Sequence, residues 1–409
     1  MKRFVVLFLF ILFVNCNYAQ NTKLDSLLAN AIIENNVLGM SVAVIKNNNL
    51  IYSKGFGIRD VERNLPVNNN TLFRIASISK MITTTALMTL YDKGLFKLDD
   101  DISQYLGFVL RNPNFPNDTI TFRKILSHTS TIIDGSKYDE FLSATQSDNP
   151  PTLRDLFLPD GKYYTADMWL TKSTKDNFFE YANINFGIIG TIIEKLTGQR
   201  FDIVVRQNVL KPLGINGSFN VQDIINIDDL AVLYRKPDSI WVAQTDAFYG
   251  VKPTPRNLSN YIIGTNGVIF SPTGGLRVTC EELAKFMQMQ LHDGILDNVR
   301  IISKKAAEIM QQCIWNYNGS NGITMNGEFK SYAFANHTTK DLLPGETLIG
   351  HPGEAYGLVS DMYFSKEKNY GIVFICNGGT FNNGAYSGWY KLEEDVFKAV
   401  YTAFDGFNK

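Results

Sequence analysis

The chain has 409 residues, of which 45% are hydrophobic and 19% are charged, and its 39 basic side chains almost balance its 40 acidic ones. This composition is typical of a globular protein with a large buried core, and it excludes a chain that is mainly disordered. A net charge of -1 provides no basic surface for a polyanion, so we expect no nucleic-acid partner.

The N-terminus has the pattern of a secretory signal peptide, predicted over residues 1–19. Two basic residues follow Met1, an apolar run extends from Phe4 to Val14, and a short polar stretch ends at Ala19. We expect cleavage after Ala19, export across the inner membrane to the periplasm and no stable membrane span, because the run is shorter than the ~20 residues that cross a bilayer. Cys16 leaves one alternative open, a lipid anchor at the mature N-terminus.

The remaining cysteines and histidines predict no metal centre. Cys280, Cys313 and Cys376 are odd in number and far apart, so we expect no disulfide framework, although one incidental bridge stays open. The four histidines show no metal-ligand spacing. Gly55-Phe56-Gly57 lacks the third glycine of a dinucleotide loop and is interpreted as a turn at a strand end. We therefore expect neither a metal nor a cofactor.

Strands are predicted near both ends of the chain. A helix over 24–35 is followed by strands over 39–45 and 50–57, and strands over 357–364 and 370–376 precede a closing helix with Leu392, Val396, Phe397 and Val400 on one face. The simplest architecture is an α/β (α+β) fold, in which one antiparallel sheet built from both termini is flanked by helices. We assign a sheet lobe to about 20–75 and 265–409, and an inserted, mainly helical lobe to about 76–264.

The middle of the chain contains well-delimited helices. Helices are predicted over 77–93 and 185–196, each closed by a glycine, and the capping box of Thr279 and Glu282 opens a third. The polar stretch over 134–175 is predicted to be a long loop that borders a binding cleft.

Ser77 and Lys80 are the first candidates for catalysis. A spacing of three places the hydroxyl and the amine on one face of the predicted helix, so a neutral amine could act as the base for the serine. The backbone N–H groups of the helix N-terminus add donors for an oxyanion. Ser365 and Lys368 repeat the same spacing on a charged hairpin turn, and we interpret that copy as an ordinary solvated turn.

Two later segments add context. Tyr181 and Asn183 come directly before the predicted helix over 185–196, and His351-Pro352-Gly353 comes directly before a predicted strand, where the glycine allows a substrate to lie close to the sheet edge. Taken singly, these residues are more typical of a packing tyrosine, a helix cap and a surface histidine.

In this order, the three segments resemble the serine beta-lactamase and penicillin-binding protein-like family, in particular the branch of class C beta-lactamases, D-Ala-D-Ala carboxypeptidases, esterases and D-aminopeptidases. Residues 73–80 look like the nucleophile segment, 181–183 like Tyr-x-Asn, and 351–353 like Lys-Thr-Gly or His-x-Gly. Segments 125–130, 210–214 and 274–276 agree as well, and the resemblance extends from about residue 25 to the C-terminus.

The resemblance implies a fold with a sheet, an inserted helical lobe and a site between them. It implies that Ser77 is the acylated nucleophile and that Lys80 and Tyr181 share the proton transfers. Which of these two is the main base stays open. His128 also resembles a family position, and we interpret it as structural.

The resemblance further implies the substrate-binding groups. Asn183 would hold the amide of the substrate, and His351 and Gly353 would line the site. The oxyanion would be bound by the backbone N–H groups of Ser77 and of Glu354, the residue that follows Gly353.

The sequence departs from the beta-lactamase pattern in two places. His351 and Pro352 stand where the pattern has lysine and threonine, so a fixed cation is replaced by a group that titrates near ~6.5 and a hydroxyl is lost. Recognition of a substrate carboxylate is thereby weakened, unless another cation such as Arg277 substitutes. Thr131 stands where the family commonly has glycine, which changes a turn.

These observations predict a secreted serine hydrolase that cleaves an ester or amide bond of a small molecule or peptide through an acyl-enzyme. A carboxypeptidase, D-aminopeptidase or esterase type is favoured. A beta-lactamase of class C type and a non-catalytic sensor that binds penicillin or wall fragments are the alternatives. The sequence identifies neither the substrate nor the oligomeric state.

Overall fold

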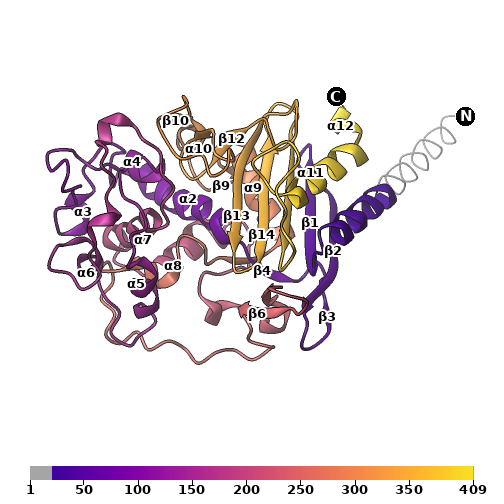
Figure 1. Ribbon diagram of the computed structural model, residues 1–409, viewed down its shortest axis with the longest axis horizontal. Helices are drawn as coiled ribbons and strands as arrows, with labels where there is room; N and C mark the ends of the chain where they lie inside the picture. Colours follow the sequence, from indigo (N-terminus) through magenta and orange to yellow (C-terminus); the bar gives the residue numbers. More distant parts are fainter. Residues whose placement is uncertain (1–20, 409) are drawn as a thin grey trace, which may run out of the picture.

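The computed structural model describes residues 21–408 and is built around a seven-stranded sheet in the order β12-β13-β14-β15-β1-β2-β3 (Figure 1). All the neighbouring strands are antiparallel. β1 (Gly39–Lys46) pairs with β15 (Tyr370–Cys376), with Met40 opposite Cys376. The prediction that both termini build one antiparallel sheet is confirmed.

The other strands of this sheet are β2 (Asn49–Asp60), β3 (Leu65–Pro66), β12 (His337–Thr339), β13 (Leu348–Ala355) and β14 (Leu358–Ser365). His351-Pro352-Gly353 precede the predicted strand over 357–364, which is present as β14, and they themselves lie inside a further strand, β13, which was not predicted. β12 pairs with β13 only as far as Gly350, so Pro352 lies where β13 has become an edge strand and a missing N–H costs no ladder bond.

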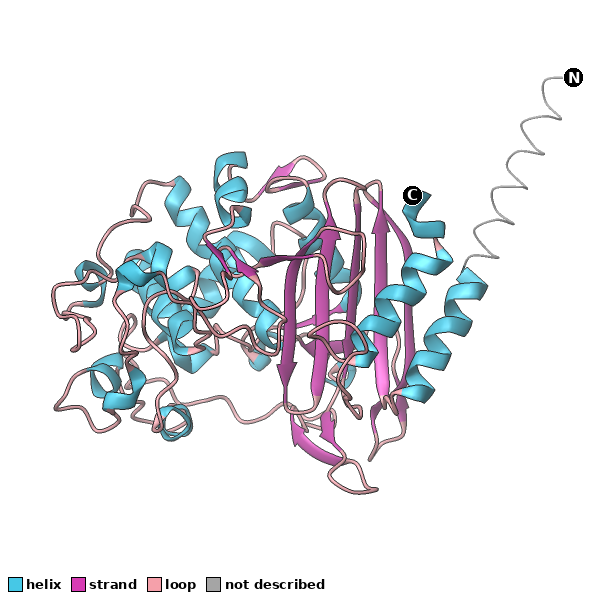
Figure 2. Ribbon diagram, turned by 45° about the horizontal axis from the view of Figure 1, so that its top comes forward, coloured by secondary structure: helices cyan, strands magenta, loops and turns pink. Residues whose placement is uncertain are grey.

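Two terminal helices cover one face of the sheet. The helix over residues 21–34 and α11 (Lys391–Ala403) pack side by side there (Figure 2). The predicted apolar faces are the buried ones, since Leu24, Leu28, Leu392 and Val396 are all inaccessible to solvent. A final short helix, α12 (Asp405–Asn408), ends the described chain.

The other face of the sheet carries the larger core. α2 (Ser79–Asp92), α7 (Ile184–Thr197), α9 (Cys280–Leu291) and α10 (Lys304–Gln311) contribute to it. The predicted capping box is present, with the Thr279 hydroxyl accepting the Glu282 N–H at 3.1 Å. The predicted helix over 77–93 differs at its start, because Ser77 lies in a 3-10 turn (Ala76–Ile78) that runs into α2.

The predicted loop over 134–175 is partly helical. It contains α5 (Tyr138–Ala144), α6 (Leu153–Phe157) and two single 3-10 turns. The polar residues that made this stretch look irregular act as caps, since Thr152 and Asp155 form a capping box that opens α6. The other short helices are α3 (Ser103–Leu106), α4 (Phe122–Leu126) and α8 (Phe201–Val205).

Four small two-stranded sheets complete the described fold. They pair β4 (Leu72–Arg74) with β7 (Arg277–Thr279), β5 (Leu233–Arg235) with β6 (Val242–Thr245), β8 (Ile295–Leu296) with β9 (Val299–Arg300), and β10 (Trp315–Asn316) with β11 (Ser331–Tyr332).

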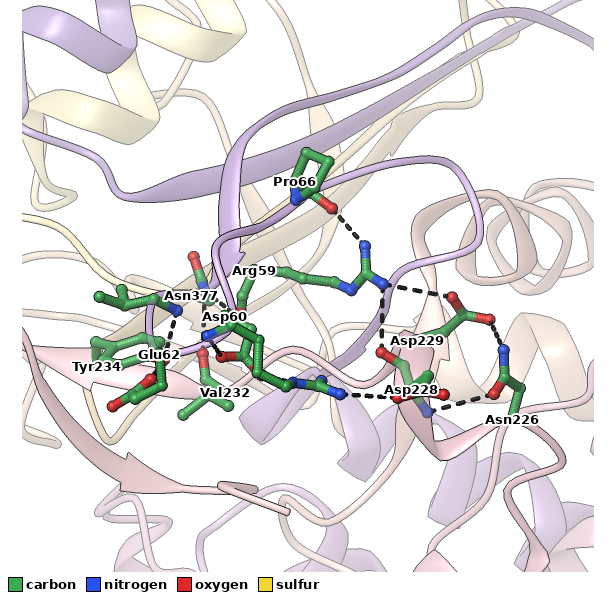
Figure 3. Close-up of polar contacts among 12 residues, drawn as sticks. Arg59, Asp60, Glu62, Pro66, Asn226, Asp228, Asp229, Val232, Tyr234 and Asn377 are labelled. Carbon is green, nitrogen blue, oxygen red and sulfur yellow. Dashed lines mark hydrogen bonds and ion pairs between the residues drawn. The ribbon is translucent and has the colours of Figure 1, made fainter. Parts of the chain in front are cut away.

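A polar network fastens the segment that leads into β5 to the edge of the main sheet (Figure 3). Arg59 at the end of β2 donates to the carbonyl of Asp228 and forms an ion pair with Asp229. The Tyr234 hydroxyl donates to Glu62, and the Asn377 amide donates to the Val232 carbonyl at 3.0 Å. These bonds hold β5, and the residues at its end, in a defined position beside the sheet.

Among residues 21–408, no helix combines the length and the apolar character needed to cross a bilayer. Cys280, Cys313 and Cys376 carry free thiols. The predicted signal peptide and Cys16 lie outside the described residues.

Candidate active site

Ser77 is the accessible residue of an otherwise buried segment. Every other residue from Ile75 to Leu90 is buried, whereas Ser77 is partly exposed and lines a cavity of about 900 Å³. Ala76 just before it has a positive φ of 43°, a conformation that non-glycine residues rarely adopt and that often occurs at functional sites. This backbone turns the Ser77 side chain toward the cavity.

The amine of Lys80 lies behind the serine. Its Nζ is 2.9 Å from Ser77 Oγ, 2.9 Å from Asn183 Oδ1 and 3.1 Å from the Thr273 carbonyl oxygen. Burial lowers the pKa of Lys80 to about 7, and the nearby carboxylate of Asp134 opposes that shift. A large fraction of Lys80 is therefore neutral near pH 7, as a base for the serine requires.

Asn183 connects the amine to the start of α7. Its Oδ1 accepts from Lys80 and from the Thr273 hydroxyl, and its Nδ2 donates to Asp134 at 3.0 Å. Asp134 also accepts the backbone N–H groups of Asn183 and Ile184, so it caps α7. The amide group of Asn183 thus orients the lysine as well as lining the cavity.

Tyr181 lies over the lysine, with its ring centre 4.8 Å from Lys80 Nζ. Burial raises the pKa of Tyr181 far above its usual value, and Ser77 lowers it slightly, so the hydroxyl keeps its proton at neutral pH. Among residues 21–408, no side chain makes a hydrogen bond of normal geometry with that hydroxyl, although Ser77 lies close enough to lower its pKa. The ring is stacked on His128, whose Nδ1 accepts the N–H of Ala182, in keeping with the structural interpretation of His128.

His351 is buried and neutral. Its Nδ1 lies 2.5 Å from the Pro352 carbonyl, to which it donates, and its Nε2 accepts from the Tyr332 hydroxyl at 2.9 Å. Burial, with smaller effects of Lys80 and His337, holds the pKa of His351 well below its usual value. The expectation that His351 titrates near ~6.5 is therefore wrong, because that value assumes a solvated imidazole.

Gly353 brings β13 against the nucleophile segment. A Cβ at this position would lie 2.6 Å from the Ile75 carbonyl oxygen and 2.5 Å from Ser360 Oγ, so only glycine allows this approach. The next residue, Glu354, directs its side chain to solvent and accepts from the Tyr390 hydroxyl at 3.0 Å. The predicted oxyanion donors, the N–H groups of Ser77 and Glu354, thus belong to two backbone segments in contact.

The cavity gathers most of the residues predicted for the site. Ser77, Tyr181, Asn183, His351, Gly353 and Glu354 all line it, and Lys80 lies behind Ser77. A second hollow of about 540 Å³, between α8 and residues 211–225, contains none of the predicted site residues. The second Ser-x-x-Lys match is indeed a hairpin turn, and Lys368 forms an ion pair there with Glu346.

Two further expectations are resolved by the packing. Arg277 is not available as a substitute cation, because it is buried and shares Asp246 with Arg74 in two ion pairs. Thr131 adopts a φ of 70°, the left-handed region that favours the glycine common in the family, and its hydroxyl accepts from Asn112 at 3.0 Å.

Sequence reasoning missed several residues of the site. Asp134 was placed only in a polar stretch, and neither Tyr332 nor Thr273 carries a motif. Arg235 and Glu328 also line the cavity. A polar residue in a loop gives no signal of its own, because its role depends on which distant segment folds against it.

Comparisons with known proteins agree with this geometry. The family model described as Beta-lactamase matches residues 24–395. The curated relative "Protein flp" of Staphylococcus aureus (strain MRSA252) is 24% identical over 355 residues, and the match covers 87% of this chain and 62% of flp. The chain thus spans less than two thirds of that relative's length.

Solved structures share the fold. The octameric penicillin-binding protein homologue from Pyrococcus abyssi has a TM-score of 0.69 at 25% identity, covering 95% of this chain and 77% of its own. D-amino acid amidase from Ochrobactrum anthropi SV3, complexed with L-phenylalanine amide, has a TM-score of 0.67 at 19% identity, covering 97% and 100%. Because the family model matches nearly the whole length of this chain, the chain belongs to the beta-lactamase family.

Proposed function

We propose that the protein is a serine hydrolase that cleaves an ester or amide bond through an acyl-enzyme on Ser77, of esterase or peptidase type. The observation that carries this proposal is the buried amine of Lys80, 2.9 Å from the Ser77 hydroxyl, with a pKa lowered to about 7. A purely binding protein has no need of a nucleophile paired with a base, so the pair speaks against a non-catalytic sensor.

In acylation, the neutral amine of Lys80 accepts the proton of Ser77 as the serine oxygen bonds to the carbonyl carbon of the substrate. The oxyanion that forms is bound by the N–H groups of Ser77 and Glu354. The proton then passes to the leaving oxygen or nitrogen as the scissile bond breaks. The protonated Tyr181 hydroxyl relays it across the gap.

In deacylation, a water molecule gives its proton to the same base and its oxygen to the acyl carbon. The bond to Ser77 then breaks, and the proton returns to the serine oxygen. Asn183 and Asp134 hold Lys80 in place through both steps, since the amine would otherwise turn away from the nucleophile.

Efficient beta-lactamase activity is the less favoured alternative. Beta-lactams present a carboxylate, and β13 offers no cation for it, because His351 is neutral and hydrogen-bonded to Tyr332. Arg277, the other candidate, is neutralised by Asp246. Export to the periplasm by residues 1–19 is part of the proposal and rests on the sequence pattern alone.

Turnover of p-nitrophenyl acetate by the mature chain tests this function. We expect hydrolysis with an acetyl adduct on the peptide that contains Ser77, and a loss of about 1,000-fold or more in Ser77→Ala. Ser365→Ala is the matched control, because it removes the serine of the second Ser-x-x-Lys match, and it is expected to keep activity. Hydrolysis that survives in Ser77→Ala would overturn the proposal.

Incubation with penicillin, followed by intact mass, separates the alternatives. Rapid loss of the drug without an adduct would indicate a beta-lactamase. A lasting adduct without ester turnover would indicate the binding protein.

A further inference from the structure

One wall of the cavity beside Ser77 is acidic. Glu328, Glu354 and Glu393 line it, and Arg235 is the only basic side chain in the lining. Within residues 21–408, none of these four side chains takes part in an ion pair. The cavity therefore contains carboxyl groups whose charge the described protein does not neutralise.

A fourth carboxyl group lies beneath this wall. Asp361 on β14 is opposite Pro352 of β13, and its side chain is 0% exposed. Because residues two apart on a strand share a face, it points to the same side of the sheet as Val359 and Glu354, which line the cavity. It thus lies beneath the cavity wall, next to Glu393, and does not itself line the cavity.

Among the described residues, no N–H group or hydroxyl donates to Asp361. The carboxyl of Glu393 lies within hydrogen-bonding reach of Asp361. Two carboxyl groups can form a hydrogen bond only when one of them is protonated, so this pair shares a proton.

The acidic groups also affect one another. Burial raises the pKa of Glu328, and repulsion from Glu393 and Glu354 raises it further. Burial and repulsion from Glu328 raise the pKa of Asp361, whereas its hydrogen bond with Glu393 lowers it. Burial and repulsion from Asp361 raise the pKa of Glu393. A cation that entered the cavity would relieve this repulsion and displace the protons that the carboxyl groups retain.

We propose that this wall, formed by Glu328, Glu354 and Glu393 with Asp361 beneath it, is a subsite for a cationic group of the substrate, of the primary ammonium class. Aromatic side chains beside it suit an amine carried on an apolar body, since Tyr317, Phe329, Trp389 and Tyr390 also line the cavity. The absence of a charge on His351 leaves nothing on β13 to repel the cation. The inference rests on the proposed hydrolase and names its substrate class.

Calorimetric binding to the Ser77→Ala protein tests the subsite without any need for turnover. Benzylammonium, benzyl alcohol and benzoate share one ring and differ in charge. We expect benzylammonium to bind at least about tenfold more tightly than either of the others. A second Glu328→Gln substitution is expected to reduce that difference to less than about threefold.

Two further variants serve as controls for this experiment. Glu308→Gln removes an exposed carboxylate of α10, outside the cavity, and is expected to leave the preference unchanged. Asp361→Asn is expected to weaken benzylammonium binding while it leaves the melting temperature equal or raises it, because the repulsion between the buried carboxyl groups of Asp361 and Glu328 is removed. A purely structural Asp361 would instead lower the melting temperature with no effect on the preference.

Tighter binding of benzoate, lost on Arg235→Gln, would overturn the proposal in favour of a carboxylate site. Equal binding of the three probes would overturn it as well. Failure of ester turnover with a retained benzylammonium preference would count against the hydrolase alone, so the two failures are distinguishable.

Discussion

Lys80 and Ser77 are joined at 2.9 Å across the boundary between core and cavity, with the amine fully buried and the hydroxyl partly exposed. The amine therefore lies on the protein side of the hydroxyl, where water does not solvate its charge. Desolvation of this kind is what lowers a lysine pKa toward neutrality. Because of this contact, the reaction rate is expected to depend on the protonation state of Lys80.

The pH dependence of the wild-type enzyme follows from this pKa. Because the neutral amine is the active form, kcat/KM for p-nitrophenyl acetate is expected to fall as pH decreases through about 7, and to reach a plateau above it. The measurement is initial rates from about pH 5 to 9, corrected for spontaneous hydrolysis. A profile without an inflection in this range would contradict the assignment of Lys80 as the base.

Asp134→Asn is expected to move that inflection to lower pH. The carboxylate of Asp134 raises the pKa of Lys80 against the effect of burial, so loss of its charge lowers the pKa further. The pH profile of kcat/KM measures the shift. Asp139→Asn, an exposed acid on α5, is the control, and a shift of equal size there would point to a general charge effect.

Gly353→Ala is expected to lower kcat by about 100-fold or more. The new methyl group would lie 2.6 Å from the Ile75 carbonyl, so β13 must move away from the segment that carries Ser77. Overpacking of this kind also costs about 1–3 kcal/mol of stability, measurable by urea unfolding. Gly274→Ala is the control, because its Cβ would first meet Ala76 at 3.6 Å, an ordinary contact.

Restoring the family's charge on β13 is expected to increase penicillin acylation. In the double variant His351→Lys and Pro352→Thr, an ammonium and a hydroxyl return to the strand that faces the cavity. The rate of adduct formation on Ser77, followed by intact mass, is expected to rise about tenfold or more over wild type. An unchanged rate in a folded variant would show that His351 is not what limits carboxylate recognition.

Much of this site is local in sequence and was predicted for that reason. A spacing of three residues in a helix brings Ser77 and Lys80 together whatever surrounds them. The alternation of apolar residues in the terminal strands likewise predicted the hairpins, and the confirmed pairing of β1 with β15 followed from placing both in one sheet. These features depend on backbone geometry within one segment.

The features that the sequence did not predict depend instead on contacts between segments that are far apart in the chain. His351 was given the pKa of a solvated histidine, whereas the contact with Tyr332 and burial make it neutral. The strand that contains Pro352 was not predicted, and β12 pairs with it only before that residue. In both cases, the pKa or the strand environment of the residue depends on a neighbour from another part of the chain.

The sequence by itself determined the sheet and the pairing of Ser77 with Lys80, because helical and strand periodicities act over a few residues. Only the tertiary structure decided that Lys80 is buried enough to have a lowered pKa, and that Glu328 and Glu393 line one cavity with Asp361 close to Glu393. Desolvation and charge repulsion depend on three-dimensional distance, and folding brings together groups that the sequence separates by tens of residues.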